Sequence, residues 1–302
     1  MTKSRKTDKA RLREKRGTGR KESYKPWLRP VEVPSMGKSN RPFGLKTYRI
    51  HCFLSLLEEY FFAIYEWQEI VEDIREQFPL LPLIKTEQIA MKMRYKHPSI
   101  NRKFKIFKGV ENSPRKNIIQ NIVMTTDFLI TINDEQGVRD IARTIKYKDE
   151  LDNDRVREKL LIEKEYWETK NIDWKCITEE NIPIALAKNL LLLRSWMIWV
   201  IDNRISYSEL IKIKRDIYRK LNKIQFGILD NGTINLRKLC RKIEEEMNYK
   251  DGFVMNVFKA LIWTKDIEVD LSKRLDFNKL KVLNMKKGDK IETIKFKRYY
   301  SI

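Results

Sequence analysis

The spacing of hydrophobic residues between positions 54 and 178 constrains the fold most, because it changes from helical to strand-like and back. Apolar residues first recur at helical spacing, then alternate in two stretches separated by a turn at 133–137, and then become helical again. This order predicts an α/β fold in which a mixed sheet is flanked by helices. The expected elements are a helix at 54–67, strands at 122–132 and 139–147, a helix at 155–169 capped by Asp154, and a strand at 174–178.

A mainly helical pattern begins at residue 181. Its most apolar stretch, 184–201, contains Lys188 and Arg194, so we interpret it as a buried helix rather than a membrane span. Helices followed by a hairpin predict a winged-helix-like domain. The expected elements here are helices at 185–201, 207–221, 236–247 and 253–264, and strands at 267–271 and 280–283.

Basic residues exceed acidic residues by a wide margin. Lys and Arg number 63 against 42 Asp and Glu, which gives a formal net charge of +21. Such a surplus favours a polyanionic partner, usually nucleic acid, with a membrane surface as the alternative. Residues 1–22 are dense in Lys and Arg and predict a basic flexible arm. We therefore expect an arm at 1–22, an α/β domain at 23–180, and a helical DNA- or partner-binding domain with a basic tail at 181–302.

The cysteines and histidines exclude several kinds of site. Cys52, Cys176 and Cys240 are far apart and form no C-x-x-C pair, which excludes a disulfide scaffold or a zinc ribbon and fits a reducing cytosol. With His51 and His97 as the sole histidines, a His-rich metal site is excluded, and we expect structural or DNA-contacting roles for both. The N-terminus lacks the apolar core of a signal peptide, so a cytoplasmic location is expected.

Glu58 lies on the core-facing stripe of the first expected helix. It is four residues after Leu54 and three before Phe61, and therefore shares their face. A carboxylate on a buried face is costly unless something binds it. Because hard cations such as Mg²⁺ bind carboxylate oxygens, Glu58 is a candidate ligand. The alternative is a position at the edge of the stripe that reaches solvent.

Asp127 lies in the middle of an expected strand, where acidic residues are disfavoured. Thr144 and Lys146 project from one face of the next strand, and the turn between the strands makes them neighbours. Asp127 is thus expected within metal-bridging reach of both. Phosphodiester hydrolysis uses divalent metal and gains from a cation beside the attacked phosphate. By itself the pattern is weak, because an exposed Asp and a solvated Lys on an edge strand explain it equally.

Several short strings of this sequence also resemble a known family. They occur in the family's order between residues 24 and 178, and the resemblance fades in the C-terminal part. The strings are YKPWL at 24–28, VEVPS at 31–35, DIREQFPL at 73–80, KHP at 96–98, TDFL at 126–129 and EYW at 165–167. The sequence resembles the TnsA-type endonuclease subunits of Tn-seven-like heteromeric bacterial transposases, which implies a restriction-endonuclease-like PD-(D/E)xK core.

The resemblance also implies an active site. In that family a helix Glu, a strand Asp and a Gln-x-Lys triplet act together, and the matching catalytic residues are Glu58, Asp127 and Lys146. Thr144 stands where the family has Gln, and a hydroxyl is a shorter, weaker ligand than an amide. The expected metal ligands are Glu58, Asp127, Thr144 and the backbone carbonyl of Ile145, holding Mg²⁺, for which Mn²⁺ is expected to substitute.

The resemblance further implies cleavage at the 5′ ends of a transposon, on the non-transferred strand, during cut-and-paste transposition. The expected partners are double-stranded DNA, a TnsB-like DDE transposase and a TnsC-like AAA+ ATPase that contacts the C-terminal domain. The alternative is a non-catalytic DNA-binding architectural or regulatory protein on a degenerate nuclease fold. The joint presence of Glu58, Asp127 and Lys146 favours the enzyme. RNA binding has the basic arm in its favour, but the sequence lacks an RRM or KH signature.

Overall fold

The structure is a computed structural model that describes residues 7–29, 32, 41–105, 115–225, 234–287 and 291. The chain divides into two compact units. The first unit comprises residues 1–59 and 70–182, and the second comprises residues 60–69 and 183–302. Each unit is described by itself.

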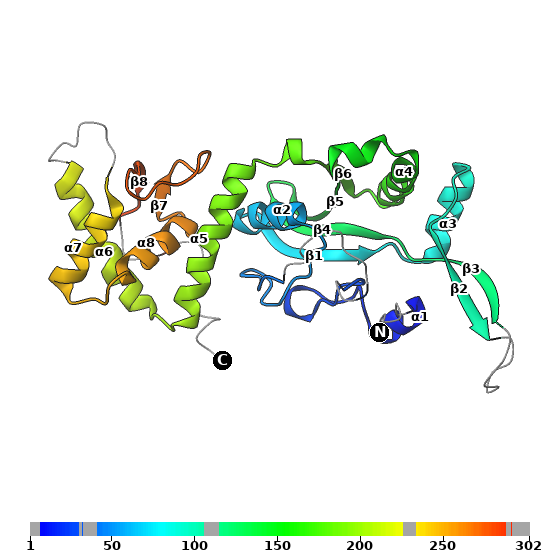
Figure 1. Ribbon diagram of the computed structural model, residues 1–302, viewed down its shortest axis with the longest axis horizontal. Coiled ribbons are helices and arrows are strands. Elements are labelled where there is room, and N and C mark those ends of the chain that lie inside the picture. Colours follow the sequence, from blue (N-terminus) through cyan, green and yellow to red (C-terminus); the bar gives the residue numbers. More distant parts are fainter. Residues whose placement is uncertain are drawn as a thin grey trace. The chain divides into compact units, whose positions relative to one another are not determined.

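A four-stranded mixed sheet forms the centre of the first unit (Figure 1). β1 and β5 both pair antiparallel with β4, and β6 pairs parallel with β5. The predicted α/β fold, a mixed sheet with flanking helices, is confirmed. The strands, in their order across the sheet, are β1 (Val71–Pro79), β4 (Thr125–Asp134), β5 (Gly137–Ile145) and β6 (Asp173–Ile177).

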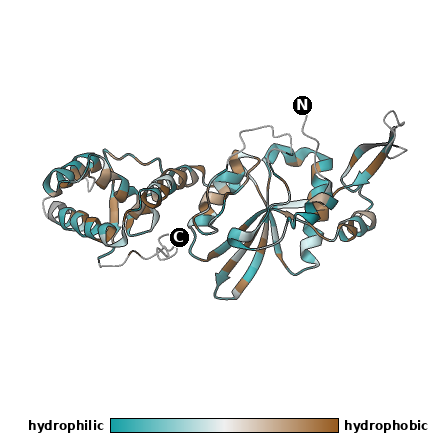
Figure 2. Ribbon diagram, turned by 90° about the horizontal axis from the view of Figure 1, so that it is seen from below, coloured by the Kyte–Doolittle hydropathy of each residue, from teal (hydrophilic) through white to brown (hydrophobic). Residues whose placement is uncertain are grey.

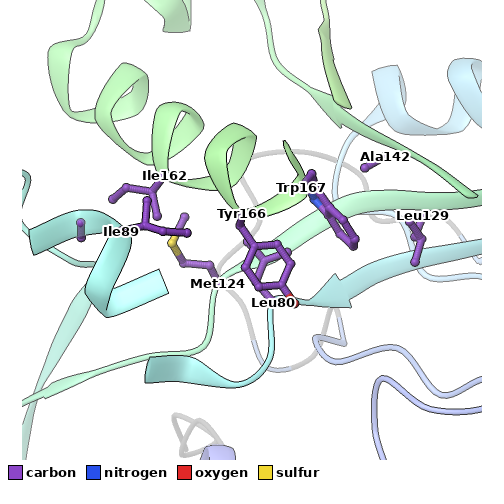
Figure 3. Packing of buried hydrophobic residues seen from close by; sticks show 9 residues of the cluster. Leu80, Ile89, Met124, Leu129, Ala142, Ile162, Tyr166 and Trp167 are labelled. Carbon is purple, nitrogen blue, oxygen red and sulfur yellow. The ribbon is translucent and has the colours of Figure 1, made fainter. Parts of the chain in front are cut away.

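Helices cover this sheet through a compact apolar core. α4 (Asp154–Glu168) contributes Tyr166 and Trp167, which pack with Leu129 of β4 and Ala142 of β5 (Figure 3). The same core includes residues of α3 (Leu83–Lys92), whereas α2 (Leu56–Trp67) begins in the first unit and ends in the second. Short 3₁₀ helices lie at Lys21–Ser23, Lys148–Asp152 and Glu179–Asn181.

The N-terminal cap of α4 differs from the prediction by one residue. The cap is Asn153, whose side-chain oxygen accepts hydrogen bonds from the backbone N–H groups of Arg155 at 2.8 Å and Val156 at 3.3 Å. Asp154 was therefore wrongly predicted as the cap. It lies in the first turn instead, where its negative charge interacts favourably with the helix dipole.

Part of the expected flexible arm is packed against the first unit. Residues 1–6 lie outside the described residues, but α1 (Asp8–Arg13) is a short helix, and Arg11 and Arg16 are buried. Arg16 Nη2 lies 2.7 Å from Glu32 Oε1, and Arg11 Nη2 lies 3.3 Å from Glu32 Oε2. Arg16 also donates to the carbonyl of Trp27 at 3.0 Å. These charge-assisted bonds hold Arg11 and Arg16 in place. Both belong to the stretch that its many basic residues predicted to be a flexible arm.

A second, two-stranded sheet projects from the first unit. Its strands are β2 (Ser99–Lys105) and β3 (Arg115–Asn121), which pair antiparallel with each other and form a sheet of their own. Both views show this hairpin extending away from the four-stranded sheet (Figures 1 and 2). We call residues 99–105 and 115–121 the basic hairpin. The sequence patterns did not predict it.

The second unit is mainly helical, as expected. Its helices are followed by a small antiparallel sheet, the order predicted for a winged-helix-like domain. The elements are α5 (Ile184–Asp202), α6 (Tyr207–Gln225), α7 (Leu236–Met247), α8 (Phe253–Trp263), β7 (Ile267–Val269) and β8 (Val282–Met285).

Among the described residues, α5 is the one helix whose length and composition would allow it to cross a membrane. It also carries polar side chains that are buried within the second unit. Arg194 Nε lies 2.5 Å from Glu66 Oε2, and Asn189 Nδ2 donates to the carbonyls of Leu271 and Lys273 at 2.9 and 2.7 Å. Such partners belong to the core helix of a folded domain and support the interpretation of this stretch as a buried helix.

Candidate active site

Asp127 lies where β4 separates from β5. The pairing between these strands runs to Phe128 and Arg143, while β4 continues to pair with β1 as far as Thr125. Beyond that point the backbone N–H of Ile145 donates to Asp127 Oδ2 at 2.8 Å instead of to a strand carbonyl. The opening between the strands therefore holds a carboxylate.

Lys146 directly follows β5 and faces this carboxylate. Its Nζ lies 3.8 Å from Asp127 Oδ2 and donates to the carbonyl of Ile145 at 2.9 Å. The Asp127 carboxylate raises the pKa of Lys146 above its ordinary value. Lys146 is therefore a cation at neutral pH and unsuited to act as a base. Its side chain is 29% exposed, which leaves the ammonium accessible to a phosphate.

Glu58 occupies the first turn of α2, which the Ser55 side chain caps. Its carboxylate accepts from the Ser55 hydroxyl and from the Leu54 N–H, both at 3.1 Å, and its own N–H donates to Ser55 Oγ at 3.1 Å. These hydrogen bonds explain why a carboxylate is tolerated at this position, but neither donor carries a positive charge that would balance it. Burial and the neighbouring Asp127 raise the pKa of Glu58 to about 8. The positive charge of Lys146 therefore does not fully balance the two carboxylates of Glu58 and Asp127, and a further cation would be bound favourably there.

The hydroxyl of Thr144 is bonded to a different carboxylate, that of Glu163 on α4. Thr144 donates to Glu163 Oε1, as do Thr126 at 2.5 Å and Trp174 Nε1 at 3.1 Å. Burial, followed by the charge of Asp127, raises the pKa of Glu163 to about 7. The structure therefore places the Lys146 ammonium beside the Asp127 carboxylate, with Glu58 near enough for the charge of Asp127 to raise its pKa. It places the Thr144 hydroxyl on Glu163.

Glu163 was not among the residues selected from the sequence, although a signal for it exists. It lies three residues after Leu160 and four before Trp167, both of which are buried. This is the spacing that selected Glu58 on the earlier helix. Applied to both helices, the same rule finds both buried carboxylates.

Gln77 of β1 holds the other oxygen of Asp127. Its Nε2 donates to Asp127 Oδ1 at 3.4 Å, and its Oε1 accepts from Thr125 at 3.3 Å. Gln77 is buried and has a φ of +48°, a left-handed conformation that costs a non-glycine residue about 1–3 kcal/mol. Both carboxylate oxygens of Asp127 are therefore oriented by donors from neighbouring strands, which is the support expected around a metal ligand.

The donor set fits a hard divalent cation. Glu58 and Asp127 provide carboxylates and Ile145 provides a carbonyl, and Mg²⁺ is typically bound by one or two carboxylates together with water and substrate phosphates. Within the described part of the chain, no three His, Cys, Asp or Glu side chains cluster as a ready-made metal site.

The raised pKa of Glu58 predicts how stability depends on pH. Because the folded pKa of about 8 exceeds the ordinary value of 4.5, this group stabilises the metal-free fold below pH 4.5, and the contribution is lost as pH rises through about 8. We expect Glu58→Gln to be more stable than wild type at pH 8, on the order of 2 kcal/mol in denaturant unfolding. At pH 5 the gain should vanish, and a gain independent of pH would contradict the assigned cause. The exposed-site change Glu168→Gln serves as the control.

A buried network of charged side chains stabilises residues 49–52, which precede α2. Both carboxylate oxygens of Glu76 are bonded, to Arg49 Nη2 at 2.5 Å and Nη1 at 2.8 Å, to His51 Nδ1 at 2.8 Å, and to the Cys52 N–H at 3.1 Å. Burial alone would raise the pKa of Glu76, but His51 and Arg49 hold it well below its usual range. The remaining histidine, His97, bonds to Thr86 at 2.9 Å. Both histidines are engaged in the interior.

Comparisons with known proteins identify the family. A family model described as "TnsA-like endonuclease N terminal" matches residues 68–179, and one described as "TnsA endonuclease C terminal" matches residues 181–271. The chain is 31% identical over 269 residues to "Transposon Tn7 transposition protein TnsA" of Escherichia coli, covering 89% of this chain and 87% of that protein. The chain belongs to the TnsA family. As a member of it, the protein is a transposition endonuclease, and its nuclease family uses divalent metal.

The two TnsA models meet near residue 180, close to the boundary between the two structural units at 182/183. The C-terminal match extends the family resemblance into the helical part, where the short strings noted in the sequence had faded. The TnsA assignment thus covers both units of the chain.

Proposed function

We propose that this TnsA-family chain cleaves the 5′ ends of a transposon, on the non-transferred strand, during cut-and-paste transposition. We further propose Glu58, Asp127 and Lys146 as its catalytic residues. The observation that carries the proposal is the 3.8 Å approach of the Lys146 ammonium to the Asp127 carboxylate at the opening between β4 and β5. The buried and under-compensated Glu58 lies in the electrostatic range of both.

Each residue has a defined task in this proposal. Asp127, Glu58 and the Ile145 carbonyl would hold Mg²⁺, for which Mn²⁺ would substitute because it accepts similar oxygen ligands. When bound, the metal would neutralise phosphate charge and lower the pKa of water. Lys146 orients the attacking water and stabilises the negative charge that develops on the phosphate. Thr144 acts through its bond to Glu163 rather than as a ligand. The products are a 5′-phosphate and a 3′-hydroxyl.

The proposed partners follow the division of the chain. Residues 23–180 form the nuclease domain that acts on double-stranded DNA, in concert with a TnsB-like DDE transposase. Residues 181–302 bind DNA and a TnsC-like AAA+ ATPase, and the setting is the cytoplasm. A row of exposed basic residues on α7 supports an acidic partner for this domain. The row consists of Arg237, Lys238, Arg241 and Lys242.

The proposal is tested by a nicking assay on transposon-end DNA, with and without the partner transposase and ATPase. We expect cleavage at the 5′ ends in Mg²⁺ or Mn²⁺ and complete loss on chelation by EDTA. Cleavage that persists in EDTA, or that maps to the 3′ ends, would overturn the proposal.

The departure at Thr144 supports one alternative, a non-catalytic DNA-binding protein on a degenerate nuclease fold. Calorimetric titration with Mg²⁺ and Mn²⁺ in the presence of DNA separates the two. No binding of either ion would favour the alternative, whereas binding that Asp127→Asn abolishes would favour the enzyme.

A further inference from the structure

Strand β3 of the basic hairpin is exposed on both of its faces. Residues 116–120 of β3 are all exposed, and successive residues of a strand point to opposite faces. Ile118 is 43% and Ile119 is 70% exposed, one on each face. Neither face of β3 is therefore covered by the rest of the described chain.

The sequences of the two hairpin strands contain basic residues and no Asp or Glu. The remaining residues include amides, which donate and accept hydrogen bonds. The basic residues are Arg102, Lys103, Lys105, Arg115 and Lys116, and the amides are Asn101, Asn117, Gln120 and Asn121. A strand pair of this composition is complementary to a polyanion.

The base of the hairpin is anchored to the first unit. Asn121 Nδ2 donates to Glu87 Oε1 of α3 at 2.8 Å, and the N–H of Ile122 donates to the carbonyl of Pro98 at 3.0 Å. The N–H of Val123 donates to Asp8 Oδ2 at 3.0 Å. These bonds hold the projecting strands in a defined direction, so the exposure does not come from a loosely attached loop.

The hairpin also leads directly into the proposed catalytic strand. Asn121 ends β3 and Asp127 follows six residues later, a span of at most about 20 Å at the rise of an extended chain. At 3.4 Å per base pair this is about six base pairs. One duplex that reaches Asp127 is therefore within reach of the hairpin.

An isolated two-stranded hairpin is only marginally stable in water, so a binding partner would stabilise it. Duplex DNA is a suitable partner, because a two-stranded ribbon fits the major groove of B-form DNA. We propose that the basic hairpin binds duplex DNA beside the cleavage site through its positive charge. This inference rests on the proposed function, because it takes DNA as the substrate. It assigns to the hairpin the task of holding the duplex over Asp127.

The test compares two variants of the full chain with equal changes of charge. The hairpin variant replaces Lys103, Lys105, Arg115 and Lys116 by Ala. The control variant replaces four exposed basic residues of α4 and its surroundings by Ala, namely Arg157, Lys164, Lys170 and Lys175. Thermal unfolding checks that both variants remain folded.

Affinity for duplex DNA is measured by fluorescence anisotropy in EDTA, where no cutting occurs, between 50 and 200 mM salt. We expect the hairpin variant to lose about 10- to 100-fold in affinity, and its salt slope to fall by up to about 3.6, since each phosphate contact contributes about 0.9. The control variant should change by less than about threefold. Equal behaviour of the two variants would overturn the proposal.

Two further outcomes separate this inference from the proposed function. If wild type binds DNA through the hairpin but never nicks, the proposed function fails and the hairpin assignment stands. If the hairpin variant binds DNA normally and loses activity solely in reactions that contain the partner proteins, the hairpin contacts a protein and the proposal falls.

Discussion

Replacing Asp127 by Ala should reduce nicking of transposon-end DNA by at least about 10³-fold, because it removes the proposed metal ligand, whose carboxylate also faces Lys146. Asp127→Asn keeps an acceptor for the Ile145 N–H and removes the charge alone, so it should be almost as inactive while remaining folded. Lys146→Ala should lose about 10²- to 10³-fold, the usual cost of removing one stabilising group from a transition state.

The matched control is Asp149→Ala, an exposed carboxylate three residues beyond Lys146. It should cut at the wild-type rate, and all four variants should bind DNA within about threefold of wild type. Asp127→Ala protein that nicks as well as wild type in Mg²⁺ would remove Asp127 from the active site.

Replacing Glu76 by Ala should destabilise the first unit by about 3–5 kcal/mol, the usual cost of removing one partner from a buried ion pair. The change leaves the Arg49 guanidinium buried without its carboxylate and removes the bonds to His51 and the Cys52 N–H. Denaturant unfolding at pH 7 measures the loss. The control is Glu168→Ala on the exposed side of α4, which should change the free energy of unfolding by less than about 0.5 kcal/mol.

The effect of Glu76 should also depend on pH. Because the folded pKa lies well below the ordinary value of 4.5, the stabilisation is present above pH 4.5 and is lost as pH falls towards the folded pKa. The difference in stability between wild type and Glu76→Ala should therefore be largest near neutral pH and shrink on acidification below about 4. A constant difference down to pH 3 would show that packing, rather than charge, is what Glu76 contributes.

The spacing of hydrophobic residues along the sequence predicted most of the helices and strands, because it depends on which face of each is buried. The helix boundaries at α7 agree with the prediction, and those of α5, α6 and α8 differ by a few residues at most. The sequence patterns did not predict β1 as a strand, because its buried positions include charged residues. These are Asp73, Arg75 and Glu76, whose partners come from other strands and loops. Such long-range pairing leaves no local pattern in the sequence.

The candidate site was predictable to the extent that it uses side chains at regular positions. Helix spacing selected Glu58, and two adjacent strands joined by a turn placed Asp127 near Lys146. The resemblance to the family, rather than the spacing, implied that the three residues act together. The position of the Thr144 hydroxyl did not follow, because it depends on how α4 packs and brings Glu163 over the sheet. The role of Gln77 also depends on tertiary structure, since its left-handed backbone is not encoded by a glycine.

The early end of pairing between β4 and β5 sets a limit on how this enzyme can be stabilised. Substitutions that extended the ladder past Phe128 and Arg143 would satisfy more backbone groups, but the Ile145 N–H would then bond to a strand carbonyl instead of to Asp127. On the proposed function, a more rigid sheet would close around the carboxylate and shut out both ion and phosphate. Efforts to improve thermal tolerance should therefore target the far ends of these strands, near Asp134 and Gly137, where tighter pairing leaves the proposed catalytic opening untouched.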